Sequence, residues 1–365
     1  MSSSIKRVGV LTAGGDCPGL NAVIRAVTKS LISMHHIEVV GIKDGFQGLI
    51  EKRAQMLSGN DVSGILTQGG TILGTSNKAN PFKYLVEKDG RTVVEDRSDA
   101  TLENAKKMGI EALVTIGGDG TQCIALGLAQ KGLRVLGVPK TIDNDLRETD
   151  LTFGHDTAVQ IATEAIDRIH TTAISHHRVM VIETMGRNAG WIALNAGIAS
   201  GGDIILVPEI PYTIEGICRK IDARLADGRL FSIIVAAEGA RSLEGGQVIK
   251  ERVNDPSMPI RLGGVGGKVA DDVEDATGIE SRVTVLGHLQ RGGTPTAFDR
   301  ILATRFGALA ADLIARGEHG KMVALKGNEI VAVPLEVAVA GPKLIDPESS
   351  IIRAARDVGT SFGDE

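Results

Sequence analysis

The strongest constraint on the fold of this chain is a repeated alternation of short apolar runs with longer helical patterns. The runs contain four or five residues, are rich in Val and Ile, and are typical of buried strands. They cover residues 8–11, 112–116, 135–138, 179–182, 204–207, 233–236 and 283–286. Helical spacing of apolar residues follows several of them, at 21–32, 122–130 and 157–169. Because parallel strands need such crossovers, the alternation predicts an α/β fold with mostly parallel sheets covered by helices.

The length of 365 residues predicts two lobes of this kind, at about 150 residues per domain. One segment, residues 242–275, breaks the alternation because it is polar and rich in glycine. We expect it to form a helix and a surface loop.

Composition excludes several classes of function. The net charge of −5 and the ten aromatic residues (seven Phe, two Tyr, one Trp) argue against nucleic acid as a partner. No apolar run reaches the ~18 residues of a membrane span, and no secretory signal precedes the first strand. Three scattered cysteines predict reduced thiols. We therefore expect a cytoplasmic protein without a membrane partner.

The first loop of interest, residues 12–21, connects the first strand to the first helix and contains Gly14 and Gly15. Glycines let backbone N–H groups approach an anion, and a helix N-terminus adds positive potential. The loop predicts phosphate binding; a plain tight turn is the alternative.

The second loop, residues 117–121, follows the buried strand at 112–116 and has one acid, Asp119, among glycines. Glycines admit phosphates, and a carboxylate is a hard oxygen ligand for Mg²⁺. An Asp-Gly turn is the alternative, although the buried strand before it favours a site.

The third loop, residues 139–145, follows the strand at 135–138 and contains two aspartates. In an extended segment Asp143 and Asp145 would point the same way. One carboxylate could take a proton from a substrate hydroxyl while the other orients it or helps to hold a metal. A solvated turn is the alternative, but Thr141 and Ile142 are not typical turn residues.

Cationic residues gather in a second group of segments, near the ends of candidate strands. These segments are residues 175–178, 185–187, 282 and 287–293. Arginine clamps phosphate with two parallel hydrogen bonds, although a lone arginine is more often a solvated surface residue. Neither the Gly-x-Gly-x-x-Gly nor the Walker A pattern is present, and no spacing suits zinc.

Together these segments resemble the 6-phosphofructokinase family, from Gly9 to about Arg316. The resemblance rests on five segments in the family's order, which are Gly14–Asn21, Gly117–Thr121, Pro139–Asp145, Met185–Arg187 and Val285–Gly293. It implies Mg²⁺-dependent transfer of a phosphoryl group from ATP to the 1-hydroxyl of fructose 6-phosphate, a step of glycolysis. It also implies a larger donor-binding lobe (1–157 plus about 295–345), a smaller sugar-binding lobe (158–294 plus a C-terminal helix at 346–365), and an active site in the cleft between them.

The resemblance implies a role for each matching residue. Asp143 would be the base, assisted by Thr141 and Asp145, and Arg187 would stabilise the transferring group. Asp119 would hold the metal. The donor would be bound by Gly14, Gly15, Lys78, Gly118, Asp119, Gly120 and Thr121. The sugar phosphate would be bound by Thr141, Ile142, Asp143, Met185, Gly186, Arg187, Glu238, His288, Leu289, Gln290 and Arg291, and by Arg178 and Arg282 reaching in from a neighbouring subunit of a homodimer or homotetramer.

Two positions bear on the donor. Gly120 is the residue of ATP-using members, since pyrophosphate users tend to have a bulky Asp there, whereas Lys140 is the residue of pyrophosphate users. We favour ATP because loss of room excludes a ligand more firmly than one flexible lysine does. The combination of Gly120 with Lys140 resembles the mixed-substrate branch of the 6-phosphofructokinase family. Pyrophosphate is the first alternative; a kinase of the diacylglycerol or NAD type and a non-catalytic sugar-phosphate sensor are more distant ones.

Overall fold

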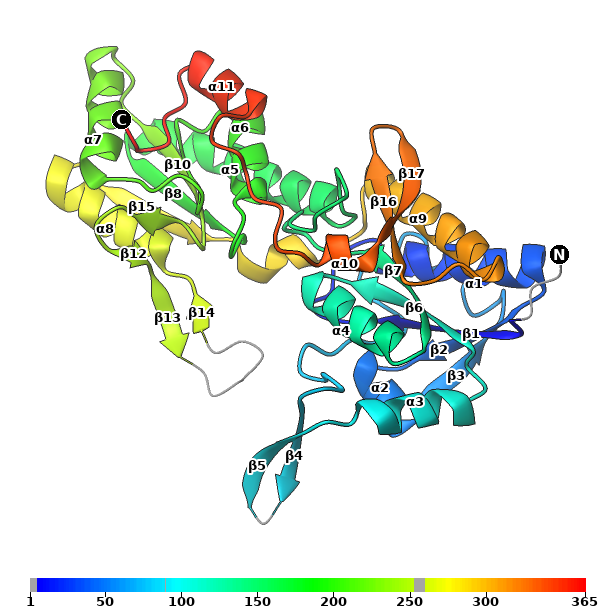
Figure 1. Ribbon diagram of the computed structural model, residues 1–365. Coiled ribbons are helices and arrows are strands. Elements are labelled where there is room, and N and C mark those ends of the chain that lie inside the picture. The colour runs from blue at the N-terminus through cyan, green and yellow to red at the C-terminus, as the bar shows by residue number, and fades with distance from the viewer. Residues whose placement is uncertain (1–4, 89, 253–259) are drawn as a thin grey trace. The chain divides into compact units, whose positions relative to one another are not determined.

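The computed structural model describes residues 5–88, 90–252 and 260–365 and confirms the α/β prediction (Figure 1). Contacts divide the chain into two compact units. Unit 1 comprises Met1–Thr141, Leu146–Asp156 and Arg291–Pro342, and unit 2 comprises Ile142–Asp145, Thr157–Gln290 and Lys343–Glu365. The expected division assigned residues 142–145 and 343–345 to the first lobe. In the structure both segments pack with unit 2, where the Lys343 N–H donates to the Asp145 carbonyl at 2.7 Å.

Unit 1 is built on a seven-stranded sheet in the order β17-β16-β7-β6-β1-β2-β3. The strands are β1 (Arg7–Thr12), β2 (Glu38–Ile42), β3 (Ala54–Leu57), β6 (Ala112–Gly117), β7 (Arg134–Pro139), β16 (Lys321–Lys326) and β17 (Glu329–Pro334). From β2 to β16 every pairing is parallel, and only the edge strands β3 and β17 run antiparallel. The carboxyl ends of β1, β6 and β7 therefore lie side by side.

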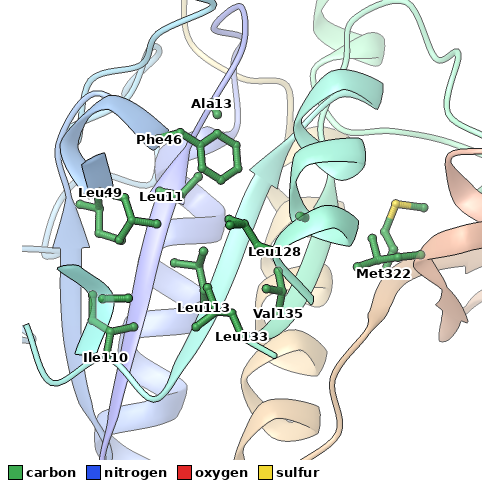
Figure 2. Close-up of a cluster of buried hydrophobic side chains, with 14 of the residues drawn as sticks. Leu11, Ala13, Phe46, Leu49, Ile110, Leu113, Leu128, Leu133, Val135 and Met322 are labelled. Atoms are coloured by element: carbon green, nitrogen blue, oxygen red, sulfur yellow. The ribbon is translucent and has the colours of Figure 1, made fainter. Parts of the chain in front are cut away.

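Helices cover both faces of this sheet. On one face α1 (Leu20–His35) and α9 (Ala297–Ala315) pack along each other and against β2, β7 and β16. On the other face α4 (Asp119–Gln130) packs on β6 and β7. Figure 2 shows the apolar cluster beneath α4, where Leu128 lies among strand residues such as Leu113 and Val135. Each such fully buried side chain contributes about 1.5–3 kcal/mol to folding.

The remaining elements of unit 1 are peripheral to the sheet. The helices are α2 (Phe46–Glu51), α3 (Ser98–Lys107) and α10 (Leu335–Ala338). A separate hairpin of β4 (Tyr84–Lys88) and β5 (Arg91–Glu95) projects from the chain between β3 and α3 (Figure 1).

Unit 2 has a smaller, fully parallel sheet in the order β15-β8-β10-β9. These strands are β8 (Val179–Thr184), β9 (Ile204–Leu206), β10 (Ser232–Ala237) and β15 (Ser281–Val285). The helices are α5 (His155–His176, beginning two residues inside unit 1), α6 (Trp191–Ala199), α7 (Ile214–Ala226) and α8 (Val265–Thr277). Apolar residues of α7 and α8 pack on β8 and β10 in one buried cluster, so the second predicted sheet is confirmed.

Two details of the prediction were wrong. The polar segment 242–275 does end in the expected helix, α8, but before it lie two short antiparallel ribbons instead of a plain surface loop. These are β11 (Arg241–Ser242) with β12 (Gly246–Gln247), and β13 (Ile249–Arg252) with β14 (Ile260–Leu262); residues 253–259 lie outside the described part of the chain.

The predicted C-terminal helix at 346–365 is limited to α11 (Ser350–Asp357). After it the backbone turns at Gly359, where φ is +93°, and Ser361 then forms a bridge with Ile204 beside the sheet. The buried Phe362 side chain fixes this extended tail in the core. No helix in the described part of the chain has the length and hydropathy needed to cross a membrane.

Candidate active site

Three strand-end loops converge in unit 1. A methyl group at Gly14 would stand 3.6 Å from Lys140 Nζ and 3.7 Å from Thr121 Oγ1, so the first, second and third loops meet at this glycine. The Lys140 N–H also donates to the Gly117 carbonyl at 3.1 Å. The adjacency of β1, β6 and β7 explains the convergence, because each loop leaves the carboxyl end of one of these strands.

Two cations donate to the first loop. Lys140 is buried, and its ammonium donates to the Gly15 carbonyl at 2.5 Å. The Arg291 guanidinium donates to the Asp16 carbonyl at 3.0 Å, and its Nη1 would lie 2.7 Å from a Cβ at Gly15. A side chain at position 15 would displace the guanidinium. The glycine therefore lets the Arg291 guanidinium approach the loop where an anion is expected.

A further segment, residues 71–76, lies against the first loop. The Thr75 hydroxyl donates to the Gly14 carbonyl at 2.6 Å, and the Gly14 N–H donates to the Ser76 carbonyl at 3.2 Å. Gly14 itself has φ +79°, a conformation that favours glycine. The exposed Lys78 follows this segment in the sequence.

The second loop is shorter than predicted, because Asp119, Gly120 and Thr121 form the first turn of α4. A carboxylate in the first turn is stabilised by the helix dipole, and the exposed Asp119 also accepts the Gly120 N–H at 2.6 Å. A Cβ at Gly120 would meet no atom within 4 Å. Among the described residues, this corner therefore has room for a side chain next to the Asp119 carboxylate.

The first loop also contains a cysteine that is shielded from solvent. Cys17 is fully buried, and desolvation raises the pKa of its thiol to about 12. Its sulfur lies 3.8 Å from the Phe153 carbonyl. A thiol with this pKa carries almost no thiolate near neutral pH, so Cys17 packs the base of the loop and does not supply a nucleophile. All three cysteines are free, as the sequence predicted.

In unit 2 the ends of β8, β10 and β15 bring another set of predicted residues together. The Gly239 N–H donates to the Gly186 carbonyl at 3.1 Å, and the Glu238 N–H donates to the Thr184 carbonyl at 2.8 Å. The 185–187 segment and Glu238 are therefore neighbours through the backbone. Arg187 and Glu238 are both half-buried.

The segment after β15 forms a 3₁₀ turn, η1 (Gly287–Arg291), in which some side chains are exposed and others are buried. His288 and Leu289 are exposed, whereas Gln290 is fully buried. The Gln290 amide accepts the Met185 N–H at 3.4 Å and donates to the Gly287 carbonyl at 3.1 Å. Gln290 therefore holds the 185–187 segment in position.

The twin-aspartate segment is not extended. Residues 142–143 form a turn, and Asn144 has φ +51°, in the left-handed region. The strand alternation that would have aligned Asp143 with Asp145 does not apply, and the argument that Ile142 is unsuited to a turn was wrong. Ile142 and Asn144 are buried, while Asp143 and Asp145 are half-buried. The turn thus alternates fully buried residues with half-buried aspartates.

Arg178 and Arg282 lie together around one acid. The Arg178 Nε donates to the Glu280 carboxylate at 2.5 Å, and Arg282 forms an ion pair with the same group. The hydrogen bond from Arg178 lowers the pKa of Glu280. Arg282 is exposed on the edge strand β15.

Sequence reasoning missed three residues at or near the third loop. Lys343 contacts that loop directly, and Trp191 and Glu209 hold the segment that contains Lys343. None lies in a glycine-rich or charged motif, and all three are brought near the third loop by chain folding alone. The one signal available was the amphipathic character of Trp191, the only tryptophan in the chain.

Glycine-lined loops at the carboxyl ends of parallel strands, with a buried lysine and an arginine among them, are typical of phosphate-binding α/β proteins. The chain belongs to the phosphofructokinase family, since the Phosphofructokinase family model matches residues 7–314.

Individual relatives cover the whole chain. ATP-dependent 6-phosphofructokinase 2 of Clostridium perfringens is 52% identical and covers 100% of both chains. Pyrophosphate–fructose 6-phosphate 1-phosphotransferase of Amycolatopsis methanolica is also 52% identical, over 94% of this chain and 97% of that protein. Among solved structures, Pichia pastoris phosphofructokinase in the T-state matches with a TM-score of 0.78 and 33% identity; the match covers 92% of this chain and 37% of that one.

Proposed function

We propose that this protein is an ATP-dependent 6-phosphofructokinase, which transfers the γ-phosphoryl group of ATP to the 1-hydroxyl of fructose 6-phosphate. The observation that carries the proposal is the convergence of Gly14, Thr121 and Lys140 at the carboxyl ends of three parallel strands. The relatives named ATP-dependent 6-phosphofructokinase, at about half identity over the full length, support the same activity.

The donor groups belong to unit 1. Backbone N–H groups at the glycines bind the phosphates, and the open space at Gly120 leaves room for a nucleotide. Lys140 and Arg291 add positive charge beside the first loop. The residues proposed to hold the donor are Gly14, Gly15, Lys78, Gly118, Asp119, Gly120 and Thr121.

The residues fit Mg²⁺ that arrives with its nucleotide. Mg²⁺ prefers one or two carboxylates together with phosphate oxygens and water, and Asp119 offers one exposed carboxylate beside glycines. The described residues contain no group of three or more His, Cys, Asp or Glu side chains suited to hold a metal without a substrate. Asp119 would bind the ion, which supplies charge neutralisation on the donor phosphates.

The acceptor groups belong mainly to unit 2. Asp143 takes the proton of the 1-hydroxyl as the sugar oxygen bonds to the γ-phosphorus and the bond from that phosphorus to the β–γ bridging oxygen breaks. Arg187 stabilises the charge of the transferring group, and Thr141 and Asp145 orient the reacting groups. The sugar phosphate is held by Ile142, Met185, Gly186, Glu238, His288, Leu289 and Arg291, with Gln290 fixing the 185–187 segment.

An assay with two donors tests the proposal. Purified protein is given fructose 6-phosphate and Mg²⁺ with either ATP or pyrophosphate, and the bisphosphate product is measured. We expect turnover with ATP. Turnover with pyrophosphate alone would overturn the choice of donor in favour of the activity named for the Amycolatopsis methanolica relative. Turnover with neither donor would favour the hypothesis of a non-catalytic sugar-phosphate sensor.

Gly120→Asp is expected to lower kcat/KM for ATP at least ~10-fold without an equal loss for pyrophosphate. The new side chain would fill space that is open in the structure, and its charge would repel a nucleotide phosphate. Any pyrophosphate turnover of the parent protein serves as the internal reference. Equal losses with both donors would contradict the steric explanation.

The proposal includes a homo-oligomer, either dimer or tetramer, in which Arg178 and Arg282 reach the site of a neighbouring subunit. Val283 and Val285, 41% and 56% exposed, follow Arg282 along the edge strand β15. An exposed apolar edge strand is stabilised when another chain covers it, which supports an interface here. The cytoplasmic location stays a prediction.

A further inference from the structure

A short C-terminal segment of unit 2, Lys343–Ile345, lies against the turn that carries Asp143. The Lys343 N–H donates to the Asp145 carbonyl at 2.7 Å, and the Lys343 ammonium donates to the Asn144 side-chain oxygen at 2.9 Å. One residue, about 200 positions further along the chain, therefore contacts two successive residues of the turn through both its backbone and its side chain. Residues 343–345 are called the C-terminal strap below.

The strap is itself fixed to the start of α6. The Trp191 indole N–H donates to the Lys343 carbonyl at 3.0 Å, and the Lys343 ammonium lies 5.7 Å from the centroid of the Trp191 ring. A cation over the face of an indole is attracted by its quadrupole. The indole thus restrains Lys343 at both its carbonyl oxygen and its charged end.

A second attachment uses the half-buried carboxylate of Glu209. It accepts the Ile345 N–H at 3.0 Å and the Gly190 N–H at 3.2 Å. Burial raises the pKa of this carboxyl, and the backbone donors oppose that rise. Gly190 is the N-cap of α6, so Glu209 joins the strap to the same helix end as Trp191.

The turn has a reason to need this support. Asn144 adopts φ +51°, which non-glycine residues rarely occupy, and its side chain is 3% exposed. Asparagine tolerates this conformation better than most side chains do, but surrounding contacts still help to hold it there. The Asn144 oxygen would lose a charged donor if Lys343 were removed. The backbone that positions the flanking carboxylates, Asp143 and Asp145, would then be less restrained.

We propose that Lys343 is a positioning residue for phosphoryl transfer: held by Trp191, it fixes the Asp143–Asp145 turn in its reactive geometry. The inference rests on the proposed function, because it takes Asp143 to be the base. A misplacement of about 1 Å in a catalytic group costs on the order of 10²-fold in rate, so even a modest relaxation of the turn is measurable. The alternative is that the strap only stabilises the fold.

The test compares Lys343→Met, Lys343→Arg and Asp143→Asn in the full chain, by kcat, KM for both substrates and melting temperature. We expect Lys343→Met to lower kcat about 10- to 100-fold with both KM values within about 2-fold. Lys343→Arg, which restores a charged donor, should recover much of the lost rate. Lys268→Met is the control, since Lys268 lies on the exposed side of α8, where it forms an ion pair with Asp272 at 2.8 Å.

The outcomes separate the two hypotheses. Normal kcat in Lys343→Met together with an impaired Asp143→Asn protein would overturn the positioning role and leave the proposed function intact. A loss of rate that merely follows a lower melting temperature, and that Lys343→Arg does not recover, would also overturn it. Full activity of Asp143→Asn would instead overturn the proposed function, and this inference with it.

If Lys343→Met fails to fold, Trp191→Phe provides the second variant. It removes the N–H that donates to Lys343 but keeps an aromatic ring in the same place. We expect the same pattern as for Lys343→Met, which is a loss of about 3- to 10-fold in kcat with little change in KM. Unchanged kcat in a folded Trp191→Phe protein would contradict the proposal.

Discussion

Replacement of Asp143 by Asn is expected to lower kcat at least ~10²-fold while fructose 6-phosphate still binds. The amide has nearly the same shape as the carboxyl group but cannot accept the proton of the 1-hydroxyl. Binding should persist because the other groups proposed to hold the sugar are unchanged. Calorimetric titration with fructose 6-phosphate and a steady-state assay with ATP measure the two quantities on the same preparation.

Asp271→Asn is the matched control for this change. Asp271 is an exposed carboxylate on α8 with no role assigned in the site, and the same substitution there should leave kcat unaltered. Unchanged turnover in the Asp143→Asn protein would remove Asp143 from the mechanism. Loss of both binding and turnover would mean that Asp143 acts mainly in holding the sugar or the fold.

The second large effect is expected from Gly239→Ala, which introduces a methyl group against the 185–187 segment. The new Cβ would overlap the Arg187 carbonyl oxygen, lie 2.7 Å from the Arg187 carbonyl carbon and lie 2.9 Å from the Gly186 carbonyl oxygen. Backbone cannot yield as a flexible side chain does, so the segment must move and take Arg187 with it. We expect about 1–3 kcal/mol of lost stability and on the order of 10²-fold lower kcat.

Gly267→Ala is the control for this substitution. Gly267 lies inside α8, where a Cβ would meet no atom within 4 Å, so alanine should stabilise the helix slightly and leave activity unchanged. Denaturant unfolding and a steady-state assay compare the two variants. A Gly239→Ala protein with normal kcat would show that Arg187 does not depend on the position of this segment.

Much of the fold could be predicted because strand and helix periodicities are local properties of the chain. The runs at 8–11, 112–116 and 135–138 became β1, β6 and β7, and the loops after them contain most of the proposed donor residues. The second loop was predicted too long because Asp119 and Gly120 suit both a turn and the first turn of a helix. The boundary between a loop and a helix depends on which backbone groups form hydrogen bonds.

The third loop was harder to predict. An Asp-Asn-Asp sequence is compatible with extended and turned backbone alike, and the choice is made by buried Ile142 and Asn144 and by the contacts of Lys343. Those contacts join residues about 200 positions apart, which no periodicity records. The ribbons within residues 242–275 were missed for a related reason, since short antiparallel pairs have too few residues for alternation to be recognised.

By itself the sequence determined the fold class, the positions of the strand-end loops and the kinds of chemical group that they contain. These follow from apolar spacing and from residue chemistry, which are encoded within a few neighbouring positions. The tertiary structure decided which loops meet, that Lys140 donates to the first loop while Gln290 supports the 185–187 segment, and that Lys343 and Trp191 brace the turn of Asp143. Such contacts join segments that are far apart in the sequence, so they depend on how the chain packs. They form because a buried polar group without a partner is costly.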